Sequence, residues 1–100
     1  MKQLRKSEFN QIMLEAKDLI LYFYRENHPM CTICESAVRE VDGMIGKNFD
    51  LYRINADTDP EILNACNVQE VPTAISIRNR RIYKRLSGKL ASNLILDLLK

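Results

Sequence analysis

The run LILYFY at residues 19–24 is the feature that most limits how this chain can fold. Six consecutive apolar or aromatic residues leave no polar face, so a strand made from them must be covered on both sides. Helices on both faces of a sheet provide that cover, which favours an α/β domain. The chain has 100 residues, of which 46% are hydrophobic, enough for one core and too few for two comfortable domains. We therefore expect a single domain over residues 1–100.

The spacing of apolar residues predicts the other elements. Recurrence at every third or fourth position is typical of amphipathic helices, and short alternating or continuous apolar runs are typical of strands. Ser7 is placed to cap the first helix, and Asp59, before Pro60, to start a later one. We expect a strand at 2–5, a helix at 7–17, the strand at 19–24, a helix at 32–47, a strand at 49–57, a helix at 60–66, strands at 73–78 and 81–86, and a last helix after Gly88. This order predicts an α/β domain with a mixed central β-sheet flanked by helices on both faces.

Charge and hydropathy give little indication of a partner. The net charge of +2, from 15 Lys and Arg against 13 Asp and Glu, is too balanced to indicate a nucleic-acid or membrane surface. The densest basic stretch, RNRRIYKR at 78–85, is most simply a solvated face. The longest apolar run is far shorter than a membrane span, and three cysteines are an odd number for a disulfide-stapled secreted domain. We expect a cytoplasmic monomer without nucleic-acid or membrane partners.

Two of the three cysteines lie in HPMCTICES, residues 28–36, where the buried strand gives way to a helix. Residues three apart share a helical face, so Cys31 and Cys34 can alternate between a dithiol and a disulfide. The unpaired N–H groups and the positive dipole end of a helix start favour an anion, which predicts a lowered pKa for Cys31. In disulfide exchange Cys31 is then the attacking thiolate, and Cys34, one turn further in, resolves the mixed disulfide.

Two other interpretations of the cysteines stay open at this point. Three cysteines and one histidine could form a Cys3His zinc site, although Cys66 would have to reach the pair from another helix and no second C-x-x-C is present. The pair could also have lost its activity. Cys66 by itself is most simply a packed, buried thiol.

Three further segments, RINAD at 53–57, EVPT at 70–73 and LSG at 86–88, occur in an order and spacing that resemble the thioredoxin family over the whole chain. The resemblance implies the thioredoxin fold and a cis-proline at Pro72 lying against the cysteine pair. It implies that the backbone of Val71 binds an extended substrate peptide. It also implies disulfide-containing protein substrates, a reductase or dithiol donor that recharges the pair, and no bound cofactor or metal.

The sequence departs from that family at several positions near the pair. Thioredoxins usually carry W-C-G-P-C where this chain has MCTIC, and the preceding loop RENHP is about three residues longer. Tyr22 falls where the family has a buried aspartate, and a phenol is a poor base at neutral pH. Arg53 falls where thioredoxins often have a lysine, and we expect this cation, with the helix start, to keep the Cys31 thiolate populated.

Two residues have weaker claims on this site. His28 could supply a further cation near Cys31, or it is an exposed loop residue, and Glu35 is most simply an ordinary acidic residue in a first helical turn. The prediction is a thiol–disulfide oxidoreductase. The alternative is a thioredoxin-like protein-binding module with little or no redox turnover, which the missing carboxylate, the absence of Trp and the Thr32–Ile33 pair support.

Overall fold

The LILYFY run forms the middle strand of the fold. The computed structural model describes residues 1–15, 18–45 and 49–100. Strand β2 (Asp18–Tyr24) pairs in parallel with β3 (Asp50–Asn55) on one side and antiparallel with β4 (Thr73–Arg78) on the other. With β1 (Lys2–Gln3) parallel to β3 and β5 (Arg81–Ser87) antiparallel to β4, the sheet is mixed, in the order β1-β3-β2-β4-β5.

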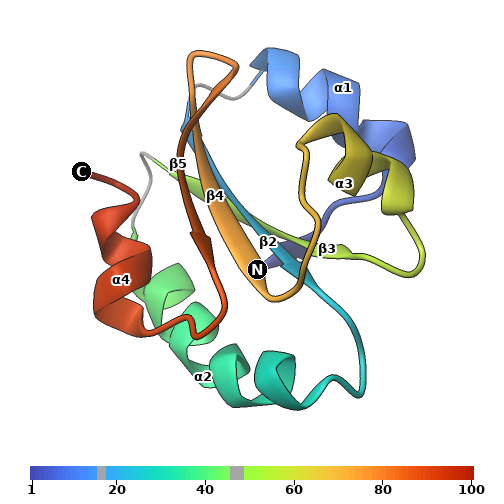
Figure 1. The fold of residues 1–100 in the computed structure, drawn as a ribbon. Coiled ribbons are helices and arrows are strands. Elements are labelled where there is room, and N and C mark those ends of the chain that lie inside the picture. Colours follow the sequence, from blue (N-terminus) through green and yellow to red (C-terminus); the bar gives the residue numbers. More distant parts are fainter. Residues whose placement is uncertain (16–17, 46–48) are drawn as a thin grey trace.

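In the described part of the chain, helices cover both faces of the sheet, α1 (Lys6–Glu15) and α3 (Pro60–Ala65) on one face and α2 (Pro29–Met44) and α4 (Ser92–Asp97) on the other (Figure 1). Successive residues of β2 point into two separate cores, as the pleat of a strand requires. Leu19, Leu21 and Phe23 belong to the α1/α3 core, and Ile20, Tyr22 and Tyr24 belong to the α2/α4 core. The predicted single α/β domain with helices on both faces of a mixed sheet is confirmed.

The first helix begins one residue earlier than expected, and a distant carboxylate caps it. The backbone N–H of Lys6 donates to Oδ1 of Asp59 at 2.9 Å, and Nε of Arg5 donates to Oδ2 at 2.8 Å. The prediction that Ser7 caps this helix is therefore wrong. Asp59 does stand at the N-cap of α3, but its buried side chain makes no bond to that helix and links α1 to α3 instead. The expected end of the first helix, at residue 17, lies outside the described residues.

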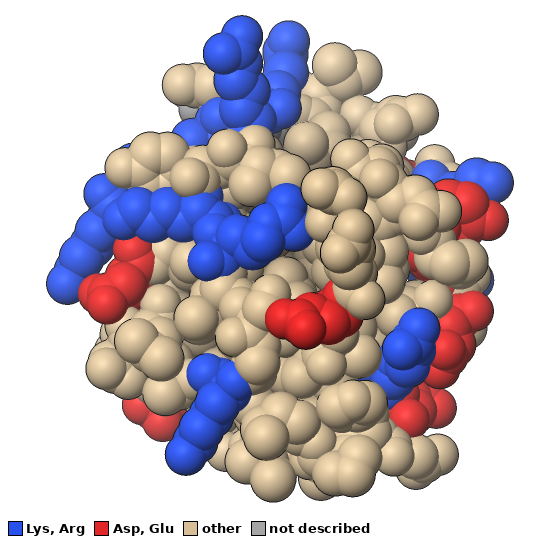
Figure 2. All heavy atoms as spheres, in the orientation of Figure 1, with Lys and Arg blue, Asp and Glu red and all other residues tan. Residues whose placement is uncertain are grey.

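The basic stretch at 78–85 has a structural role. Within the described residues, the last turns of α1, α3 and α4 contain no basic residue, so their final carbonyl groups meet no cation from the helix itself. The β4–β5 hairpin supplies the donors: Arg85 bonds the carbonyls of Cys66 and Asn67, Lys84 that of Asp97, Arg78 that of Leu99 and Arg80 that of Leu14. Lys and Arg side chains form a band at the upper left of Figure 2. Residues 79–85 of the hairpin are exposed to solvent, as expected, but several of their cations also bond helix ends.

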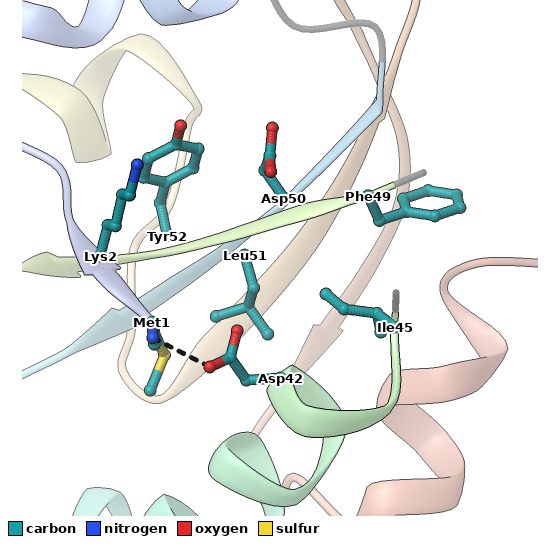
Figure 3. Close-up of a pocket in the computed structure, with 8 residues that line it drawn as sticks. All are labelled: Met1, Lys2, Asp42, Ile45, Phe49, Asp50, Leu51 and Tyr52. Atoms are coloured by element: carbon teal, nitrogen blue, oxygen red, sulfur yellow. Dashed lines mark ion pairs between the residues drawn. The ribbon is translucent and has the colours of Figure 1, made fainter. Parts of the chain in front are cut away.

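A pocket lies at the opposite end of α2 from the cysteine pair. Its lining residues come from β1, β3 and the end of α2, and the Met1 ammonium lies 2.9 Å from Oδ2 of Asp42 (Figure 3). This ion pair ties β1, an edge strand of only two residues, to the last turns of α2. Its contribution is to the packing of that edge.

The Asp59 contacts predict a loss of stability when its charge is removed. Burial alone would raise the pKa of Asp59, but hydrogen bonds from Lys6, Thr58 and Arg5 hold it below the usual value. We expect Asp59→Asn to lower the free energy of unfolding by about 2 kcal/mol at pH 7, because charge-assisted hydrogen bonds to a buried carboxylate are lost. Urea denaturation of the wild type and the variant measures this difference in the free energy of unfolding.

The sign of the pH dependence gives a second readout from the same variant. A carboxyl group whose folded pKa is depressed stabilises the protein above its unfolded pKa near 3.9, and that stability is lost as the pH falls through the folded pKa. The wild type should therefore lose more stability than Asp59→Asn between pH 5 and pH 2. The exposed Asp57→Asn is the matched control, expected within about 0.5 kcal/mol of wild type at pH 7. Equal acid sensitivity of Asp59→Asn and wild type would contradict the assignment.

Candidate active site

The cysteine pair lies where β2 ends and α2 begins. The chain leaves β2 after Tyr24, turns through a loop and enters α2 at Pro29, the first helical position and one that proline favours. His28 is the N-cap, and its Nδ1 accepts the backbone N–H of Cys31 at 3.3 Å. The helix therefore begins three residues before the predicted start at Thr32, and His28 is a half-buried cap where an exposed loop residue was the alternative. The described helix ends at Met44, and the expected end at 47 lies outside the described residues.

Cys31 and Cys34 are both almost fully buried, one turn apart in the first part of α2. The sulfur of Cys34 accepts the backbone N–H of Leu90 at 3.2 Å, and the carbonyl oxygen of Gly88 lies 4.0 Å from the same sulfur. The turn after β5 thus presents one backbone donor and one backbone acceptor to the Cys34 sulfur.

The same turn connects the cysteine pair to EVPT. The N–H of Gly88 donates to the carbonyl of Pro72 at 3.1 Å, while its carbonyl faces Cys34. Gly88 has a φ of +89°, a conformation that glycine adopts without steric cost. The Val71–Pro72 peptide bond is cis, and half-buried Val71 packs against the core that contains both cysteines. The structure therefore brings together Cys31, Cys34 and the Val71–Pro72 edge.

Tyr22 lies behind the pair and is fully buried. Its hydroxyl is 3.5 Å from two acceptors, the carbonyl oxygen of Cys31 and Oε2 of Glu35. Burial raises the pKa of Tyr22 well above its usual value, and the charges of Cys31 and Glu35 raise it further. The phenol stays protonated at neutral pH and acts as a donor, which agrees with the expectation that Tyr22 is a poor base.

Glu35 is more than the ordinary acidic residue of a first helical turn that the sequence indicates. Its side chain is 29% exposed, and its Oε1 lies 3.5 Å from Nη1 of Arg53 and 3.2 Å from Nε of Arg39. With Tyr22 on Oε2, both carboxylate oxygens have partners. An acidic residue directly after a C-x-x-C and four after its first cysteine shares that cysteine's helical face, and this spacing was the available signal.

Arg53 reaches the site but does not serve Cys31 as expected. Its guanidinium stacks over the ring of Tyr24, 4.3 Å from the centroid, and pairs with Glu35. The cation that acts on Cys31 is Arg25, whose backbone N–H and charge both favour the Cys31 thiolate. Arg25 belongs to the lengthened loop RENHP, and its position beside the pair could not be inferred from spacing alone. Arg25, Arg53, Glu35 and Cys31 line one cavity of about 340 Å³.

The predicted low pKa of Cys31 is wrong in direction. Burial of the sulfur raises the pKa of Cys31, and the charges of Cys34 and Glu35 add to that rise, while Arg25 opposes it. The helix start does not overcome burial, because α2 begins two residues before Cys31 and places the sulfur inside the first turn, with only 3% of the residue exposed. The Cys31 N–H is also already bonded to His28.

Cys66 is separated from the pair by the sheet. It belongs to the α1/α3 core, whereas Cys31 and Cys34 belong to the α2/α4 core. Burial raises the pKa of Cys66 to about 11. A zinc site that uses all three thiols is therefore incompatible with this fold, and the described residues contain no cluster of three or more His, Cys, Asp or Glu side chains suited to a metal.

No helix within the described ranges combines the length and the apolar character that crossing a membrane requires.

The buried position of Cys31 predicts its pH-dependent reactivity. Only the thiolate alkylates, so the rate with iodoacetamide rises as the pH passes through the pKa of Cys31. We expect the midpoint of this profile above about 8.5, the ordinary cysteine value, with mass spectrometry of the Cys31 peptide in fully reduced protein as the measurement. Glutathione under the same conditions is the control. A midpoint near pH 7 would show that the helix start and Arg25 outweigh burial.

Comparison with known proteins gives one consistent family. The thioredoxin family model matches residues 1–100. Thioredoxin 2 of Plasmodium falciparum is 22% identical over 91 residues, 91% of this chain and 58% of that protein, so this chain spans less than two thirds of that relative. The thioredoxin-like protein slr1139 of Synechocystis sp. is 22% identical over 99 residues, 98% of this chain and 91% of that protein.

Solved structures show the same fold. A point mutant of the thioredoxin from Halobacterium salinarum superposes with a TM-score of 0.82 at 16% identity, covering 98% of this chain and 85% of that one. A chain in a structure described as "Structural basis of the thiol resolving mechanism in yeast mitochondrial 1-Cys peroxiredoxin via glutathione/thioredoxin systems" gives 0.88 at 15% identity, covering 99% and 93%. With Cys31 and Cys34 spaced as C-x-x-C and the family model matching the whole chain, this protein belongs to the thioredoxin family.

Proposed function

We propose that this chain is a thiol–disulfide oxidoreductase that exchanges disulfides with protein substrates through Cys31 and Cys34. The family and the fold support oxidoreductase chemistry of this class. The observation that carries the proposal is the Gly88 turn, which contacts the sulfur of Cys34 on one side and the carbonyl of cis-Pro72 on the other. A resolving thiol and a substrate-binding edge are thereby held by one short segment.

In this proposal Cys31 attacks first. Its thiolate bonds to one sulfur of a substrate disulfide, the S–S bond of the substrate breaks, and the released thiolate takes up a proton. Exposed Ile33, between the two cysteines, and half-buried Val71 border the pair and provide apolar contact for the substrate chain. The backbone of Val71 is the element that pairs with the extended substrate peptide.

Cys34 then resolves the mixed disulfide. It loses its proton, attacks the sulfur of Cys31, and releases the second substrate thiol, leaving a Cys31–Cys34 disulfide. The N–H of Leu90, 3.2 Å from the Cys34 sulfur, stabilises the thiolate formed in this step. The protein then needs two electrons from a reductase or a dithiol donor, and it works in a reducing, cytoplasmic setting as a monomer.

Reduction of insulin by dithiothreitol tests the proposal. We expect wild-type protein to accelerate precipitation of the insulin B chain, and Cys31→Ser to give only the dithiothreitol background, because no attacking sulfur remains. Cys34→Ser should accumulate a mixed disulfide with insulin, visible as a mass adduct. Cys66→Ala, on the other face of the sheet, is the matched control and should keep wild-type turnover.

The same assay distinguishes the oxidoreductase from the alternative function, a thioredoxin-like protein-binding module with little or no redox turnover. A protein-binding module would give equal rates for wild type and Cys31→Ser. Retention of the fold in each variant is checked by circular dichroism, so that a lost rate is assigned to the missing thiol and not to unfolding.

A further inference from the structure

We infer that Glu35 and Arg25, which line one cavity with Cys31, are the charged side chains that tune its reactivity, Arg25 promoting it and Glu35 opposing it, and that Arg53 acts on Cys31 only by holding Glu35. The inference rests on the proposed function in one respect, since it takes Cys31 as the attacking thiol. The family resemblance indicates a buried aspartate and a lysine as the charges near the attacking thiol, and in this chain Tyr22 and Arg53 stand at those positions. The inference assigns the charges that act on Cys31 to two other residues, Glu35 and Arg25.

The geometry of Glu35 fixes its charge near Cys31. Residues four apart on a helix are neighbours, so Glu35 lies on the same side of α2 as Cys31, and both line the cavity of about 340 Å³. The carboxylate is held from two other directions, by the hydroxyl of Tyr22 from β2 and by Arg53 from β3. Because both of its oxygens are bonded to side chains of the sheet, the carboxylate cannot turn fully into solvent. The protein between it and Cys31 screens its charge less than water would.

The opposing charge comes from the loop before the helix. Arg25 lines the same cavity, and its Nε lies 3.0 Å from Oδ1 of Asp57. Both its backbone N–H and its charge favour the Cys31 thiolate, whereas Glu35 disfavours it. The thiol thus shares this cavity with a cation from the loop and a carboxylate from its own helix.

The remaining groups around Cys31 do not replace this pair. Cys34, on α2, disfavours the Cys31 thiolate in the same direction as Glu35, and it is unchanged in every variant proposed below. Tyr22, on β2, stays protonated and carries no charge at neutral pH, and Nδ1 of His28 is occupied as the acceptor of the Cys31 N–H. Glu26, on the loop, lines the cavity and is exposed to solvent, which screens its charge. Arg53, on β3, is placed on the Tyr24 ring and the Glu35 carboxylate, and its charge is not among those that act directly on Cys31.

Removing the charge of Glu35 should make Cys31 more reactive. We expect Glu35→Gln to raise the rate of iodoacetamide alkylation of Cys31 at pH 7 by roughly 3- to 10-fold and to move the midpoint of the pH profile downward. Arg25→Gln should move the midpoint upward. Glu40→Gln, an exposed glutamate on the same helix, is the matched control for net charge and helix propensity, and should leave the profile unchanged. Glu35→Asp keeps the negative charge, so its pH profile should lie closer to wild type than that of Glu35→Gln. A structural disturbance caused by replacing Glu35 would shift both profiles alike.

A double-mutant cycle tests the role of Arg53. Arg53→Gln alone should lower the reactivity of Cys31, because Glu35 keeps Arg39 and Tyr22 but loses the cation that holds it to β3. In the Glu35→Gln background the same change should have no effect, since nothing remains for Arg53 to hold. An Arg53→Gln effect that persists at full size in that background would overturn the indirect role, and a Glu35→Gln profile identical to that of Glu40→Gln would overturn the inference as a whole.

Alkylation is a single step on Cys31 and needs no turnover. A shifted profile with no insulin reduction would remove the proposed function and leave the charge assignment in place. Normal insulin reduction with unshifted profiles would do the reverse.

Discussion

The rest of the structure depends on the burial of β2 on both faces. Its alternating residues divide the interior into two cores, and this division separates Cys66 from the cysteine pair. Its neighbours β3 and β4 bring Arg53 and Ala74 beside Tyr22, so the space behind the pair is filled by groups from three strands. Because β2 ends at Tyr24, the loop that follows must pass beside α2, and this path puts Arg25 next to Cys31.

Burial also dominates the chemistry of the site. The dipole at a helix start stabilises a thiolate only as a partial positive charge would. Removing an ionised sulfur from water costs more free energy than this. Because Cys31 is only 3% exposed, the cost of burial prevails and its pKa is raised. The chain places its carboxylate on α2, at Glu35, and a protonated phenol on β2, where the family resemblance indicates a buried acid. The charges near the attacking thiol are therefore arranged differently from what the family pattern implies.

The sequence predicted features that depend on contacts between residues near one another in the chain. It did not predict contacts between residues that are far apart in the chain. The apolar run of β2, the helical spacing of α2 and the pair Cys31–Cys34 are visible as periodicity, and they predicted the fold and its elements. The side chain of Asp59 caps a helix that begins 53 positions earlier, and the hairpin at 78–85 bonds the ends of three helices. No periodicity encodes such long-range hydrogen bonds. The N-cap at His28 was missed for a different reason, since histidine is an uncommon cap and Pro29 was interpreted as a loop residue.

The central claim is that Cys31 and Cys34 form a reversible disulfide within the native fold while Cys66 stays a thiol. Equilibration of the folded protein in glutathione redox buffers, followed by acid quenching, alkylation and peptide mapping, measures this most directly. The account predicts one two-electron transition, a linkage of Cys31 to Cys34, and a Cys66 that is alkylated only after unfolding. A disulfide that includes Cys66, or a Cys31 that forms only a glutathione adduct and never links to Cys34, would contradict it.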